Sequence, residues 1–207
     1  MPDKISSALE KMITKYHSDQ AHVEYVSHLA QHLFTSLQTL HKLDEIHLKY
    51  VTLAAYLHDI GHFIGKREHH EHSRYLIMHD RFLNDLEEKE RRTVGLIVLN
   101  HRKPEILDLD SCDQDLQELQ SLISILRIAD VLDYEHKQST KIKSVQYDPE
   151  QQTVVIDINW KNFMKYEKKI QKKIQWAANS WQVTLVVRSK KDQIIISPVL
   201  QPVMEVL

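Results

Sequence analysis

Apolar residues recur at helical spacing through the first two thirds of the chain. Between residues 19 and 40 they fall three or four positions apart, which predicts a long amphipathic helix with Asp19 as its N-cap. A similar stripe over residues 46–57 predicts a helix that ends near Gly61, a natural C-terminal glycine. Further helices are expected over residues 6–17, 71–83, 87–101 and 114–138, with a polar loop over 62–71, and Pro104 helps to end the fifth helix.

The pattern changes after about residue 139, where segments of alternating β-branched residues replace the helical stripes. Residues 143–147 and 153–158 flank the turn signal Asp148-Pro149 and predict a hairpin. Residues 162–178 read as a helix, and residues 181–188 and 193–197 predict a second strand pair. We therefore expect a mainly α fold, with a helical domain over residues 1–138 and a small C-terminal α+β subdomain over residues 139–207.

Composition narrows the function classes. The 207 residues include 3 glycines, 1 cysteine and 14 histidines. The only glycines are Gly61, Gly65 and Gly95, and their spacing forms no dinucleotide-binding turn, Walker A loop or nucleophile elbow. A single cysteine excludes an intrachain disulfide and cysteine-based metal clusters, so any metal must be held by histidine and carboxylate side chains. The chain has no secretory signal or membrane-length apolar run, and we expect a cytoplasmic protein without membrane contact.

Ionisable side chains stand on or beside the apolar stripes at a few positions. Asp130 continues the stripe of the helix predicted over 114–138, and His22, His58 and His101 lie next to apolar positions of other helices. A buried ionisable group must be paired, neutralised or bound to a cation, and a shared metal would satisfy several such groups at once. The alternative is that each histidine is an ordinary core residue bonded to a backbone carbonyl, with Asp130 paired to an arginine such as Arg102.

The order of these residues resembles a known signature. His22, the adjacent pair His58-Asp59 and the distant Asp130 are similar to the H…HD…D pattern of the HD-domain metal-dependent phosphohydrolase superfamily. The resemblance implies an HD-domain helical bundle in which these four residues hold one divalent metal ion. It makes Asp59 and His58 the catalytic candidates, with a metal-bound hydroxide as the nucleophile.

Two further histidines resemble the additional ligands of dinuclear HD proteins. By this resemblance Asp59 would bridge to a second metal held by His72 and His101. His69 and His70 compete with His72, which we favour because Tyr75 and Leu76 would place it on the inward side of its helix. Imidazole and carboxylate ligands suit Mn, Fe, Ni, Zn or Mg, and the sequence leaves open which metal binds and whether one or two ions do.

A narrower resemblance covers roughly residues 15–200. The segments 19–40, 54–77, 100–104 and 126–133, with the strand-helix-strand tail, are similar to the C-terminal HD region of the exopolyphosphatase/guanosine pentaphosphatase (Ppx/GppA) family. In that family phosphate hydrolysis belongs to actin-like N-terminal domains with glycine-rich loops, which we expect this chain to lack. The resemblance therefore does not transfer the family's named activity.

Basic residues near the predicted site are candidates for binding a phosphate. Lys66 lies in the loop after His58-Asp59, and Arg102 follows a predicted ligand directly. Arg127, one turn before Asp130, could instead orient that carboxylate. For each of these side chains, solvation at the surface is the alternative.

Six lysines fall in the helix predicted over 162–178 and just before it: Lys161, Lys165, Lys168, Lys169, Lys172 and Lys173. Apolar residues form the opposite stripe, so a solvated face is the simplest interpretation. The sharper alternative is a surface that contacts polyphosphate or nucleic acid, whose binding would weaken steeply with salt.

The sequence thus predicts a metal-dependent HD-type phosphohydrolase that acts on a small phosphorylated substrate, with a nucleotide as the first candidate. The alternative is a non-catalytic HD module that binds polyphosphate or nucleic acid through its lysine-rich C-terminal subdomain. A homodimer is an option that the sequence does not decide.

Overall fold

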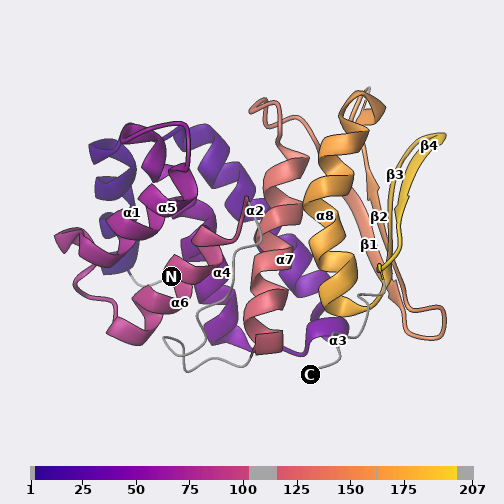
Figure 1. The fold of residues 1–207 in the computed structure, drawn as a ribbon, viewed down its shortest axis with the longest axis horizontal. Coiled ribbons are helices and arrows are strands. Elements are labelled where there is room, and N and C mark those ends of the chain that lie inside the picture. Colours follow the sequence, from indigo (N-terminus) through magenta and orange to yellow (C-terminus); the bar gives the residue numbers. More distant parts are fainter. Residues whose placement is uncertain (1–2, 103–115, 162, 200–207) are drawn as a thin grey trace, which may run out of the picture.

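The computed structural model describes residues 3–102, 116–161 and 163–199. Its larger part is a bundle of helices, drawn on the left of Figure 1. These helices are α1 (Asp3–Lys15), α2 (Gln20–Ser36), α3 (Gln38–His41), α4 (Glu45–Leu57), α5 (His69–His79), α6 (Glu88–Leu99) and α7 (Leu116–Leu132). Two short 3-10 helices, η1 (Ile60–Phe63) and η2 (Arg81–Leu83), connect α4 to α5 and α5 to α6.

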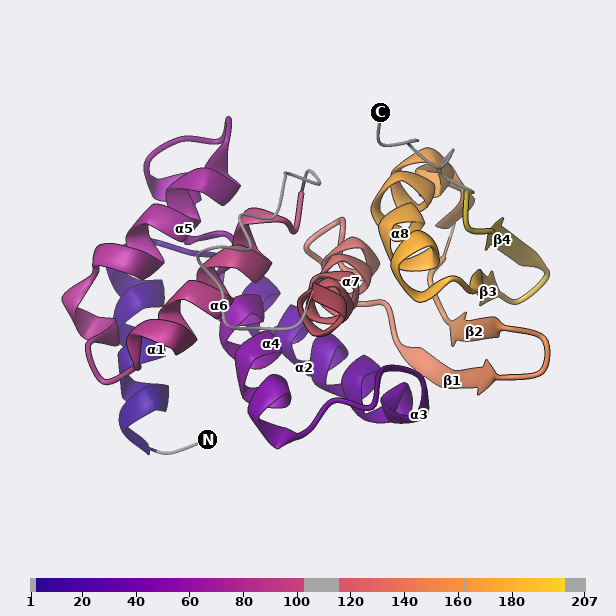
Figure 2. The ribbon, with the colours of Figure 1, turned by 60° about the horizontal axis from the view of Figure 1, so that its bottom comes forward.

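The C-terminal part is a four-stranded sheet with one helix packed on it. Its elements are β1 (Ile142–Asp148), β2 (Thr153–Ile158), η4 (Phe163–Tyr166), α8 (Glu167–Trp181), β3 (Thr184–Ser189) and β4 (Asp192–Ile196). The strand order is β1-β2-β3-β4, with antiparallel outer pairs and a parallel central pair that α8 connects. Figures 1 and 2 both show α8 between the sheet and α7, so this helix joins the two parts of the molecule.

Helices α4 and α7 occupy the centre of the bundle. Most of their side chains are buried, because both carry apolar residues around most of their circumference. α4 packs against α2 and α6, and α7 packs against α2, α4 and α8. The polar residues at the ends of these central helices are therefore held near the middle of the molecule.

The boundaries of several elements differ from the sequence-based expectation. The helix expected over 19–40 breaks at Leu37, and α2 and α3 meet there. Asp19 is the N-cap of α2, as predicted, and accepts a hydrogen bond from the His22 backbone. α7 ends at Leu132 instead of continuing to residue 138, and α5 begins at His69, two residues early. Pro104, expected to end the fifth helix, lies outside the described residues.

Gly61 has a different role from the predicted one. It does not have a positive φ and does not cap α4, because it lies inside η1. A Cβ at this position would collide with the carbonyl oxygen of His69 and lie 2.5 Å from the backbone nitrogen of Ser73. Glycine is needed here because η1 and the first turns of α5 approach each other closely. Within the described residues, no helix combines the length and apolarity that a membrane span requires.

Candidate metal centre

Four helices direct polar side chains to one point inside the bundle. His22 lies in the first turn of α2, the pair His58-Asp59 follows α4, His101 follows α6, and Asp130 lies in the last turn of α7. These residues are far apart in the sequence, and the packing of α2, α4, α6 and α7 around one another brings them together. The structure thus assembles the four residues of the predicted first metal site and one histidine of the second.

The Asp59 carboxylate is the centre of this cluster. Its Oδ2 lies 3.9 Å from His22 Nε2, and its Oδ1 lies 3.6 Å from His58 Nε2 and 3.9 Å from His101 Nε2. Asp130 approaches from the other side, with Oδ1 at 3.8 Å from His22 Nε2 and 3.9 Å from His58 Nε2. His22, His58 and Asp130 each offer a ligand atom within 4.8 Å of the others. Both carboxylates therefore face imidazole nitrogens on more than one helix.

Hydrogen bonds fix the orientation of the imidazole rings. The Nδ1 atom of His58 faces the Ala55 carbonyl at 2.8 Å, and that of His101 faces the Val98 carbonyl at 2.6 Å. His22 Nδ1 faces the buried Asp133 carboxylate at 2.8 Å. Because carbonyl and carboxylate oxygens only accept, each Nδ1 carries a proton, and each Nε2 is directed toward the cluster.

Two of these Nε2 atoms have no hydrogen-bond partner among the described residues. The Nε2 atoms of His22 and His58 are buried and unpartnered, although buried polar atoms in proteins are nearly always satisfied. A divalent cation between the imidazoles and the carboxylates would satisfy them. The donor set of neutral imidazole and carboxylate fits Mn, Fe, Ni, Zn or Mg.

The fourth imidazole of the cluster comes from His69. Its Nε2 lies 3.3 Å from Asp59 Oδ1 and 3.1 Å from His101 Nε2, and its Nδ1 faces the Lys66 carbonyl at 3.2 Å. Burial lowers the pKa of His69 to about 4, so the ring is neutral and able to act as a ligand at neutral pH. Burial likewise holds the pKa of His101 well below its ordinary value.

The favoured His72 does not lie in the cluster. Its half-buried ring lies close to Gly65 in the loop, and no described contact joins it to Asp59. The expectation that His72 points inward is wrong because Tyr75 is 60% exposed, so the inward face of α5 is the one that carries His69 and Ser73. The sequence does not decide between His69 and His72. A shift of two residues in the predicted start of the helix changes which side chains are expected to face inward.

Two further histidines cover the cluster. His62 stacks on His69 with ring centroids 4.0 Å apart, and its Nε2 lies 3.6 Å from Asp59 Oδ1. His136 stacks on His22 with centroids 3.7 Å apart. From the sequence we expect His62 either beside the ligands or in the loop, and His136 in a surface or packing role.

A lysine from the C-terminal part also reaches the cluster. Lys173 of α8 pairs with the Asp130 carboxylate and donates to the His101 carbonyl at 3.0 Å. Burial raises the pKa of the Asp130 carboxyl, but the charge of Lys173 has the larger opposing effect together with the nearby histidines, and the pKa lies well below its usual range. Lys173 was expected on a solvated face, and the other five lysines of that face are indeed exposed.

The arginines have other partners than the sequence suggested. Arg127 does not pair with Asp130. Arg127 is 2% exposed, and its guanidinium donates to the backbone carbonyls of Asn100, Lys172 and Lys173. Arg102, an alternative partner for Asp130, instead donates to the Lys66 carbonyl at 3.4 Å.

The two substrate-binding candidates lie at the edge of the cluster. Arg102 Nη1 is 3.5 Å from His69 Nδ1, so its charge lies beside the cluster. Lys66 contacts this region through its carbonyl oxygen, and its side chain is exposed. Arg102 is therefore the better placed of the two for a bound anion.

Comparisons with known proteins point to one family. A profile of the family described as Ppx/GppA phosphatase, domain III, matches residues 6–175. The chain is also similar to the guanosine-5'-triphosphate,3'-diphosphate pyrophosphatase of Pseudoalteromonas atlantica, with 27% identity over 141 residues. That match covers 66% of this chain but 28% of the relative, so the likeness concerns about a quarter of the longer protein.

Proposed function

The chain belongs to the Ppx/GppA phosphatase domain III family, and from that premise we propose that it is a metal-dependent phosphohydrolase of the HD type. The substrate class is a small phosphorylated molecule, with a nucleotide as the first candidate, which is also the chemistry named for the Pseudoalteromonas relative. One observation carries the proposal: two buried imidazole nitrogens, on His22 and His58, face carboxylates and have no hydrogen-bond partner among the described residues.

Asp59 is common to both of the proposed cation sites. His22, His58, Asp59 and Asp130 would hold one cation, and Asp59 would share a second with His69 and His101. Two cations supply Lewis acidity to a phosphoryl group and lower the pKa of water, which is the chemistry that phosphoester hydrolysis needs. The central position of Asp59 supports this sharing, because its Oδ2 faces His22 and its Oδ1 faces His58, His69 and His101.

The remaining roles fall to residues around the ligands. Asp133 accepts a hydrogen bond from His22 Nδ1 and so directs Nε2 toward the cluster, and the Ala55 and Val98 carbonyls do the same for His58 and His101. Arg102 can bind a phosphate oxygen at the rim beside His69. Lys173 neutralises part of the carboxylate charge from the C-terminal side.

The second candidate function is a non-catalytic module that binds polyphosphate or nucleic acid. It is favoured by the exposure of five lysines along η4 and α8 and the preceding turn. The inward-facing imidazoles argue against it, because a surface that binds anions has no need of unpartnered buried nitrogens. Salt-sensitive polyphosphate binding without turnover would support this second function.

The test is metal analysis and hydrolysis with a matched pair of variants. Asp59→Asn removes the central charge, and Asp85→Asn makes the same change at an exposed position outside the cluster. We expect wild type and Asp85→Asn to bind divalent metal and to hydrolyse phosphoesters or nucleotides with Mn added. Asp59→Asn should lose both by about 100-fold or more. A wild-type chain that binds no divalent metal and hydrolyses none of these substrates would overturn the proposal.

A further inference from the structure

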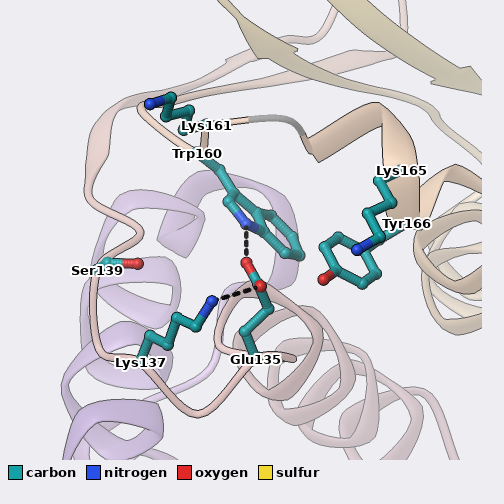
Figure 3. A pocket seen from close by; sticks show the side chains of 7 residues that line it. All are labelled: Glu135, Lys137, Ser139, Trp160, Lys161, Lys165 and Tyr166. Atoms are coloured by element: carbon teal, nitrogen blue, oxygen red, sulfur yellow. Dashed lines mark hydrogen bonds and ion pairs between the residues drawn. The ribbon is translucent and has the colours of Figure 1, made fainter.

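A pocket outside the metal centre lies where the loop after α7 meets the C-terminal subdomain. Its volume is about 280 Å³, and seven residues line it: Glu135, Lys137, Ser139, Trp160, Lys161, Lys165 and Tyr166. Figure 3 shows that they come from three segments, namely the loop after α7, the turn after β2 and η4. We call this cavity the loop pocket.

The loop pocket has a rigid aromatic wall. Trp160 and Tyr166 stack with ring centroids 5.4 Å apart and an interplanar angle of 16°, and Trp160 is 4% exposed. The indole nitrogen of Trp160 donates to Glu135 at 3.2 Å, and Ser189 of β3 donates to the Trp160 carbonyl at 3.2 Å. The wall is therefore anchored to both parts of the molecule.

The lining carries an excess of positive charge. Glu135 is the pocket's one acidic residue, and Lys137 already pairs with it at 2.8 Å. Lys161 and Lys165 are exposed at the rim, and within the described part of the chain neither has a carboxylate within 4.0 Å. Neither ammonium group is thus paired with a carboxylate, and that of Lys165 lies 5.6 Å from the centroid of the Tyr166 ring. The Ser139 hydroxyl, turned toward Trp160 in Figure 3, adds a neutral donor.

The backbone of the loop is held in an uncommon conformation. His136 and Gln138, which flank Lys137, both have left-handed φ values of 52° and 51°. A left-handed residue other than glycine costs about 1 kcal/mol or more, so the surrounding contacts must maintain this shape. Asp133 supplies such contacts, because it accepts hydrogen bonds from the Gln138 backbone at 2.7 Å and its side chain at 3.1 Å.

We propose that the loop pocket binds a dianionic phosphate group, either free or carried by a small molecule. The two ammonium groups of Lys161 and Lys165 match its charge, and the Ser139 hydroxyl and Lys137 supply further donors. The site is separate from the candidate metal centre, but one loop contributes to both. His136 stacks on His22, and its neighbours in the sequence, Glu135 and Lys137, line the loop pocket. The inference does not depend on the hydrolase proposal, because it concerns binding without metal.

The experiment is titration calorimetry with inorganic phosphate in a chelator-containing buffer, which removes metal from the cluster. Lys161→Gln/Lys165→Gln removes both charges. Lys11→Gln/Lys89→Gln makes the same charge change on exposed positions of α1 and α6, at the far side of the bundle. We expect the pocket variant to bind phosphate about tenfold more weakly than wild type, and the control within about twofold.

Two further measurements identify the bound species and distinguish weaker binding from misfolding. Glycerol phosphate that binds about as tightly as inorganic phosphate supports recognition of the phosphate alone, and tighter binding of the ester supports a carried phosphate. The conservative Lys161→Arg/Lys165→Arg variant should retain binding, which separates a charge effect from a folding effect. Phosphate binding that is equal in wild type and the pocket variant, or that is lost in Asp59→Asn only, would overturn the proposal.

Discussion

At the scale of single residues, the cluster is a set of imidazoles whose protons are already placed. His22, His58 and His101 each donate a hydrogen bond from Nδ1 to an oxygen of the protein, so each Nε2 is turned toward the cluster. Such an arrangement orients a metal ligand before the metal binds, and its outer partners matter nearly as much as the ligands. The sequence identifies these histidines, but their outer partners come from the fold.

The choice between His69 and His72 gives the sharpest prediction at this scale. His69→Gln should lower the metal content of the Mn-loaded protein by about one ion per chain, because its Nε2 faces Asp59. His72→Gln, three residues along the same helix, should leave the metal content unchanged. Elemental analysis after gel filtration measures both. If His72→Gln loses metal and His69→Gln does not, the assignment of the second cation is wrong.

At the scale of elements, the approach of η1 to α5 decides which histidine enters the cluster. Gly61 donates its backbone N–H to Ser73 Oγ at 2.8 Å, and the same hydroxyl donates to the His58 carbonyl at 2.7 Å. These bonds fix the rotation of α5 against the end of α4. His69 faces Asp59 because this rotation is set by a close contact, which a pattern of apolar residues does not report.

Gly61→Ala tests that contact. The added methyl group would collide with the first turn of α5, so we expect a loss of about 1–3 kcal/mol in the free energy of unfolding, together with weaker metal binding. Gly65→Ala is the matched control, since its Cβ would meet nothing closer than 3.7 Å. Its effect should stay within about 0.5 kcal/mol. Urea denaturation of the two variants measures both, and an unchanged stability in Gly61→Ala would contradict the argument.

At the scale of the whole molecule, the two parts of the chain are joined through a buried arginine. Arg127 of α7 donates to the carbonyls of Lys172 and Lys173 on α8 and of Asn100 after α6, and its guanidinium lies 5.8 Å from the Trp176 ring. Burial lowers the pKa of Arg127 to about 10, so the side chain is still charged at neutral pH. These bonds hold α8 where Lys173 meets Asp130.

Replacement of this arginine should therefore affect both stability and the metal centre. Arg127→Met removes three hydrogen bonds from a buried guanidinium to backbone carbonyls and should lower the free energy of unfolding by about 2–4 kcal/mol. Arg92→Met, which breaks an exposed pair with Glu88, should change it by less than about 1 kcal/mol. Denaturation curves distinguish the two. Equal effects would mean that the join between α7 and α8 does not depend on Arg127.

The domain boundary predicted at residue 138 does not separate the residues of the candidate site. The last helix of the bundle, α7, ends before that residue and β1 begins after it. Lys173 of the second part nevertheless contacts Asp130 and His101 of the first. The family match over residues 6–175 also crosses the boundary. A boundary placed where the secondary structure changes separates helices from strands, but the candidate site contains residues from both sides of that boundary.

The sequence by itself determined the helical and strand segments, the restriction of any metal to histidine and carboxylate ligands, and the grouping of His22, His58, Asp59, His101 and Asp130. It could do so because apolar periodicity and residue order are local properties of the chain. Only the tertiary structure placed His69 beside Asp59, brought Lys173 to Asp130 and formed the loop pocket. Those outcomes depend on the rotation and contact of whole helices, and a helix turns by about 100° for each residue, so a shift of one or two positions changes which side chain faces inward.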